Sequence, residues 1–133
     1  MRIKKEKLTL LRNRDGWQTG PENLARGDAW LNKIYKQNLS TTTDNFRAHK
    51  DFEFISREIT YGFYLSDHSI LGPVETELVV LSGIMIQNLP FETAWHLRGT
   101  RRVGVSFDDV ELIQQCVSYP LVTTTSHLTG AVG

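Results

Sequence analysis

Residues 78–86 form a segment that is apolar almost all round and that belongs in the core of a folded protein. A run of this kind is compatible with a buried strand or with a central helix. Pro73, followed by Glu75 and Glu77, is typical of a helix start, because early carboxylates complement the positive end of the helix dipole. The acidic start and the length of the segment favour a central helix that runs from Pro73 through Gln87.

Two further helices are expected in the N-terminal half. Pro21 suits the first turn of a helix, and apolar residues follow it at helical spacing through about Asn38. The polar run 40–43 is expected to interrupt this pattern. Asp44 is a candidate N-cap for a second, amphipathic helix that ends near Gly62.

The C-terminal half carries clear start and stop signals. Pro90 opens a helix that is expected to end at Gly104 in the left-handed C-terminal position. Ser106, with Asp109 three residues later, is a weak capping box for a last helix that reaches about Val117. Together these patterns predict an all-α protein of about five helices.

The domain organisation is expected to be simple, because 133 residues suffice for one compact domain. Residues 1–20 are interpreted as an N-terminal arm and residues 21–117 as the helical domain. Residues 118–133 contain Pro120, two glycines and no charge, and they are predicted to form an irregular C-terminal tail.

Composition narrows the class of protein. Fifteen Lys and Arg balance fifteen Asp and Glu, so no nucleic-acid partner is expected, while near-neutrality favours self-association. Cys116 is the single cysteine, which excludes an internal disulfide and fits a reducing cytoplasmic location. No histidine pair has metal-ligand spacing, no stretch approaches the length of a membrane span, and neither a metal nor a membrane partner is expected.

His96 is the candidate catalytic residue, because imidazole transfers protons near neutral pH. Helical spacing places Glu92 on the same face one turn earlier, where its carboxylate could hold the ring; a solvated surface pair is an equal alternative. Gly99, on the same face, leaves room for a ligand or for close helix packing.

Glu77 is the other candidate partner, with stabilisation of the helix start as an equal alternative. By helical rise its position and that of His96 are mismatched by about 8 Å along their helices, so contact is expected to need a bend, a water or another subunit. Arg98, Arg101 and Arg102 could clamp a carboxylate but point away from His96, which favours surface or subunit-interface roles.

Residues 44–117 resemble the carboxymuconolactone decarboxylase family, a branch of the alkylhydroperoxidase D-like superfamily. The resemblance rests on Tyr61-Gly62 and the Ser-Ile-Leu-Gly-Pro loop that follows it, on residues 75–81, and above all on residues 95–106, which read Trp-His-Leu-Arg-Gly-Thr-Arg-Arg-Val-Gly-Val-Ser before an acidic helix start. The irregular tail departs from the family, whose last helix continues further.

The resemblance implies an alkylhydroperoxidase D-like all-α fold, assembly as trimers or hexamers, and His96 as the catalytic histidine. The peroxidase branch has cysteines seven and four residues before this histidine, where the present chain has Leu89 and Glu92. Glu77 matches the family glutamate nineteen residues upstream. Peroxide reduction through a disulfide is therefore not expected.

Family members without the cysteines include decarboxylases of lactone acids and proteins of fungal natural-product pathways thought to decarboxylate aromatic polyketide acids. The resemblance implies a decarboxylase without a cofactor that acts on a small carboxylic acid. His96 is expected to donate the proton, with Glu77 or, from its spacing on the same helix, Glu92 holding its tautomer as the other catalytic residues. A non-catalytic, oligomer-forming accessory protein and a lactone hydrolase or isomerase are the alternatives.

Overall fold

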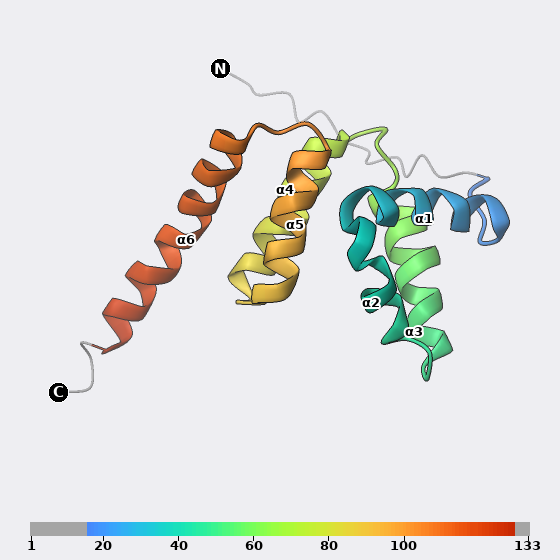
Figure 1. Ribbon diagram of the computed structural model, residues 1–133, viewed down its shortest axis with the longest axis horizontal. Coiled ribbons are helices and arrows are strands. Elements are labelled where there is room, and N and C mark those ends of the chain that lie inside the picture. Colours follow the sequence, from blue (N-terminus) through green and yellow to red (C-terminus); the bar gives the residue numbers. More distant parts are fainter. Residues whose placement is uncertain (1–15, 130–133) are drawn as a thin grey trace, which may run out of the picture.

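The computed structural model describes the backbone of residues 16–129 and the side chains of residues 16–118. These residues are helical and contain no strand, so the prediction of an all-α protein is confirmed. The five longer helical segments of the structure are α1, α3 joined to η2, α4, α5 and α6 (Figure 1). The elements in chain order are α1 (Pro21–Tyr35), η1 (Lys36–Asn38), α2 (Leu39–Asp44), α3 (Lys50–Phe54), η2 (Ile55–Leu65), α4 (Pro73–Ile86), α5 (Pro90–Arg102) and α6 (Phe107–Thr129).

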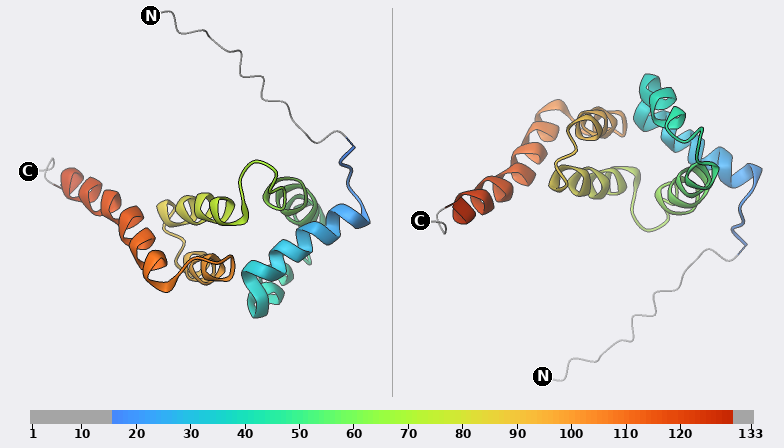
Figure 2. Two further views of the ribbon diagram at one scale, coloured as in Figure 1. Left: turned by 90° about the horizontal axis from the view of Figure 1, so that it is seen from above. Right: turned by 90° about the horizontal axis from the view of Figure 1, so that it is seen from below.

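The helices form two packed pairs that meet in the middle of the molecule. α1 packs against η2, α4 packs against α5, and α1 also contacts α5. Figures 1 and 2 show α6 leaning away from the α4–α5 pair, which it contacts less closely than those helices contact each other. The core cluster lies where α1 and η2 meet; it consists of Trp30, Leu31, Ile34, Tyr35 and Tyr61.

The predicted helix signals of the C-terminal half agree with the structure. α4 and α5 begin at Pro73 and Pro90, as expected. Gly104 has φ 114°, a left-handed conformation that glycine adopts without steric cost. The Asp109 backbone N–H donates to the Ser106 hydroxyl over 3.1 Å, so the predicted cap is formed.

The boundaries predicted between residues 35 and 50 are wrong. α1 ends at Tyr35 because Lys36 has φ 46°, outside the helical region. The threonine run then continues in helical form as α2, and the Thr42 and Thr43 hydroxyls donate to the carbonyls of Asn38 and Leu39, four residues earlier. Asp44 ends α2 instead of capping the next helix, which begins at Lys50.

η2 is a π-helix where an ordinary α-helix was predicted. In this wider helix the Ser66 N–H donates to the carbonyl of Tyr61, five residues earlier. In this helix, residues spaced four apart, such as Arg57, Tyr61 and Leu65, lie near one face, and this face is turned toward α1. Arg57 pairs there with Asp28, and Leu65 packs on the core cluster.

The prediction of an irregular tail from residue 118 is also wrong as far as the structure describes it. α6 continues to Thr129 and includes Pro120, although an interior proline costs roughly 3 kcal/mol relative to alanine. A proline in a helix lacks the N–H donor and also crowds the carbonyl four residues earlier. No glycine occurs between Pro120 and Gly130 that would favour an earlier end of the helix. The predicted arm lies largely in residues 1–15, outside the described part.

Candidate functional site

His96 lies in the interior of the molecule, on the face of α5 that meets α1 and α4, with only 1% of its surface exposed. Gly99, one turn later, permits this close packing. A Cβ atom at this glycine would lie 2.7 Å from Ile34 Cγ2 and 2.9 Å from Glu77 Oε1. Of the two interpretations of Gly99, close helix packing is therefore the one that the structure supports.

Glu77 reaches His96 directly. Its Oε1 atom lies 2.7 Å from His96 Nδ1, and both side chains are 1% exposed. The expectation that contact needs a bend, a water or another subunit is wrong. The count of helical rise ignored the connection between the helices, in which Leu89 is extended, and the length of the glutamate side chain.

Tyr35 and Tyr61 extend this pair into a chain of four polar groups. The Tyr35 hydroxyl lies 2.8 Å from His96 Nε2 and 3.0 Å from the Tyr61 hydroxyl. Tyr35 was missed as a site residue, and Tyr61 was named only as part of the family resemblance. The available signal was that a buried tyrosine hydroxyl needs a hydrogen-bond partner.

The hydrogen bonds among Glu77, His96, Tyr35 and Tyr61 can be donated in either of two directions. When His96 is neutral and its Nδ1–H donates to the Glu77 carboxylate, Nε2 accepts from Tyr35 and Tyr35 accepts from Tyr61. When the ring is protonated, Nε2–H donates to Tyr35, which then donates to Tyr61. The arrangement can therefore carry a proton between the imidazole and the two hydroxyls.

Burial keeps both tyrosines neutral. Loss of solvent raises the pKa of Tyr35, against a lowering by the hydrogen bond from Tyr61, and the charges of Glu77 and Glu92 raise it further. Burial is also the main cause that raises the pKa of Tyr61 well above the ordinary value of 10.0; the interaction with Tyr35 adds to it.

Glu92 does not hold the ring. Both nitrogens of His96 are already bonded, to Glu77 and to Tyr35, so the predicted Glu92 partnership is not formed. The two carboxylates differ in position: Glu77 comes from α4, opposite the ring, whereas Glu92 lies one turn earlier on α5 itself and is only half-buried. The charge of Glu92 contributes to the site by raising the pKa of Tyr35.

The arginines of α5 divide into two groups. Arg102 donates to the carbonyl of Ile34 and so ties α5 to the end of α1. Arg98 and Arg101 are exposed on the other side of the helix. This matches the predicted orientation away from His96.

Two of the other histidines differ in their surroundings. His49 is exposed. His68 packs edge-on against Trp30, with 4.6 Å between ring centroids, and its Nε2 is buried without a hydrogen bond in the described structure. Among the side chains of residues 16–118 there is no cluster of three or more potential metal ligands, and no helix of the described part is long and apolar enough to cross a membrane.

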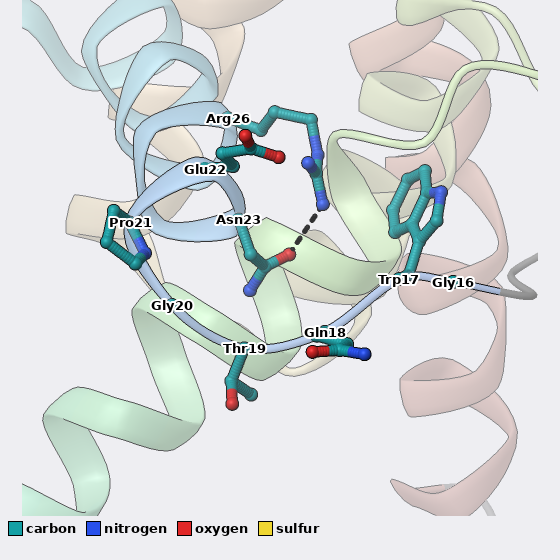
Figure 3. A pocket seen from close by; sticks show the side chains of 9 residues that line it. All are labelled: Gly16, Trp17, Gln18, Thr19, Gly20, Pro21, Glu22, Asn23 and Arg26. Atoms are coloured by element: carbon teal, nitrogen blue, oxygen red, sulfur yellow. Dashed lines mark hydrogen bonds between the residues drawn. The ribbon is translucent and has the colours of Figure 1, made fainter.

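Pockets on the described residues lie away from His96. One of about 720 Å³ surrounds the start of α1 (Figure 3), where Arg26 donates to Asn23 and lies 4.3 Å from the ring of Trp17. The N-terminus of α1 already has an anionic partner, because the Gly20 N–H donates to the Glu58 carboxylate. This pocket and the four others described, of about 190 to 450 Å³, are lined by residues outside the four-group chain.

No family model, curated protein or solved structure matches the chain. The resemblance to carboxymuconolactone decarboxylases stays a prediction from the sequence, and the site is interpreted from its own geometry.

Proposed function

We propose that the chain is a cofactor-independent decarboxylase that acts on an aromatic polyketide acid or on a β-keto or lactone acid. The observation that supports this proposal is the buried chain Glu77–His96–Tyr35–Tyr61, which joins a carboxylate, an imidazole and two hydroxyls over 2.7 to 3.0 Å steps. Such a chain is suited to general acid–base catalysis.

Loss of carbon dioxide from a β-keto acid leaves an enolate, because the electrons of the broken carbon–carbon bond move onto the neighbouring carbonyl. The enzyme must then return one proton to carbon. In this proposal His96 stores that proton as an imidazolium, and the Glu77 carboxylate stabilises its charge.

Delivery of the proton passes through the tyrosines. Nε2 of His96 contacts the Tyr35 hydroxyl, so a proton that leaves the ring moves to Tyr35 while Tyr35 passes its own proton onward. Exposure rises from 1% at Glu77 and His96 to 6% at Tyr35 and 9% at Tyr61. A substrate would therefore meet these four groups at the Tyr35–Tyr61 end.

Self-association is part of the proposal. Large apolar side chains stay exposed around the α4–α5 pair, including Val79 (64%), Ile86 (62%) and Phe91 (72%). Exposed large apolar side chains, where they gather on one surface, are typical of interfaces. A trimer or hexamer, as the family resemblance implies, would cover it.

The alternative is a non-catalytic accessory protein of the same fold. It is favoured by the location of the pockets, which are lined by residues other than His96, and by the full set of hydrogen bonds on the ring. In that case the four groups would serve to fix the packing of four helices.

Mass spectrometry of aromatic and β-keto acids incubated with the protein tests the proposal. Wild type and an Arg47→Gln control, altered at an exposed site, should remove carbon dioxide, whereas His96→Gln should not. Tyr35→Phe should lower turnover without loss of fold, as checked by circular dichroism. If no acid is converted, or if folded His96→Gln is as active as wild type, His96 is not a catalytic residue and the accessory role is favoured.

A further inference from the structure

A pocket that is separate from the His96 site lies between α5 and α6. The two helices diverge after the turn that joins them (Figure 1) and leave a groove of about 450 Å³. This volume falls within the range of small-molecule sites, which is roughly 300–1,000 Å³. An adjoining hollow of about 350 Å³ shares Leu97 and Gln114 with it, so the groove continues toward the end of α4.

The walls of the groove are apolar and its charge is positive. Leu97, Phe107 and Val110 provide apolar surface, and Arg98 and Arg101 bring two guanidinium groups. Glu111 is the one carboxylate in the lining, which leaves one positive charge uncompensated. Among the side chains that the structure describes, neither arginine has an ion pair.

Arg101 is partly ordered for binding. Its guanidinium lies 5.2 Å from the centroid of the Phe107 ring, a cation–π contact that leaves the N–H edge available. Arg98 is three residues earlier on the same helix, so both groups can reach one carboxylate. Bidentate contact with a carboxylate is the geometry that guanidinium groups favour.

We propose that the α5–α6 groove binds a small monocarboxylic acid with an apolar, hydroxyl-bearing body. Arg98 and Arg101 hold the carboxylate, Leu97 and Phe107 cover the apolar body, and Glu111 accepts a hydrogen bond from the hydroxyl. One carboxylate balances the uncompensated charge. A helix of a second copy is the other occupant that the test must separate, because Arg and aromatic residues are also enriched at protein interfaces.

This site is distinct from the His96 chain. His96 faces α1 and α4, whereas the groove residues lie on the opposite side of α5 and face α6. Binding there does not depend on whether the protein is a decarboxylase, and its test can fail or succeed independently.

Calorimetric titration with 4-hydroxybenzoate at low ionic strength tests this site, with 4-hydroxybenzamide as the uncharged comparison. Wild type should bind the acid with a dissociation constant below about 1 mM and the amide at least about tenfold more weakly. Arg98→Gln/Arg101→Gln should lose at least about tenfold in affinity for the acid. Arg47→Gln, an exposed arginine on another element, should bind as wild type does.

Equal affinity of the double variant and wild type would overturn the proposal. So would the absence of binding by wild type. A groove filled by a second copy would show itself as an oligomer that the double variant dissociates in light scattering, and this result would also refute the small-acid site.

Discussion

Gly99 illustrates how a single missing side chain shapes the site. Its Cα lies where Ile34 and Glu77 both approach α5, and a methyl group there would overlap with each of them. Gly83, on α4, has nothing within 4 Å of the corresponding position. The two helical glycines therefore predict opposite effects of the same substitution.

Gly99→Ala should lower the free energy of unfolding by about 1–3 kcal/mol, because the added carbon forces Ile34 or Glu77 to move. Gly83→Ala should raise it by about 0.5–1 kcal/mol, because alanine is the better helix former. Urea unfolding of both variants measures the difference. A stable Gly99→Ala would show that α5 is not packed as closely as described.

The buried tyrosines predict a dependence on alkaline pH. Burial raises the pKa of Tyr61 in the folded state, so below the ordinary value of 10.0 the hydroxyl is neutral in both states and its contribution to stability is complete. Above this pH the unfolded chain ionises first. The free energy of unfolding should then fall by up to about 1.4 kcal/mol per pH unit for such a group.

Urea unfolding between pH 9 and pH 11 measures this loss. Tyr61→Phe should make the decline shallower, since phenylalanine cannot ionise. Phe52→Leu, at an exposed residue without an ionisable group, should keep the wild-type slope. Identical slopes in all three proteins would contradict the buried position of Tyr61.

At the scale of elements, the sequence predicted those helices that begin at a local chemical signal. Pro73, Pro90 and the Ser106 cap mark starts that depend only on adjacent residues. The end of α1 at Lys36, where φ is 46°, and the π-helix η2 follow no start or stop signal in the adjacent residues. His96 and Glu77 could be nominated from the sequence. For Tyr35 the sequence offered only the general need of a buried hydroxyl for a partner, and it did not identify His96, which lies sixty-one residues away.

The Ser106 cap predicts how α6 is stabilised. Ser106→Ala should weaken the first turn of α6 by about 0.5–2 kcal/mol, because the Asp109 N–H loses its acceptor. Hydrogen exchange of the first amides of α6 should become faster. Ser106→Thr keeps the hydroxyl and should exchange nearly as wild type does; an unchanged rate in Ser106→Ala would mean that the cap does not stabilise the helix.

At the scale of the whole molecule, α4 is the element whose surroundings are incomplete. Leu81 and Met85 are buried against the rest of the chain, but Val79 and Ile86, seven residues apart on one face, are more than 60% exposed. A helix that is apolar all round is normally surrounded by protein. This exposed face is where we expect copies of the chain to meet.

Val79→Glu/Ile86→Glu should therefore dissociate the oligomer. Size-exclusion chromatography with light scattering should give a trimer or hexamer for wild type and a monomer near 15.2 kDa for the variant. Thr41→Glu, an exposed change on α2, should leave the oligomer intact. A monomeric wild type would refute self-association, and an intact double variant would place the contact elsewhere.

The origin of the four linked groups has a consequence for folding kinetics. Tyr35, Tyr61, Glu77 and His96 come from four helices, so their hydrogen bonds form only after all four have docked and lost water. Substitutions that remove one hydroxyl, such as Tyr35→Phe, should thus accelerate unfolding and leave the refolding rate nearly unchanged, the behaviour of contacts absent from the transition state.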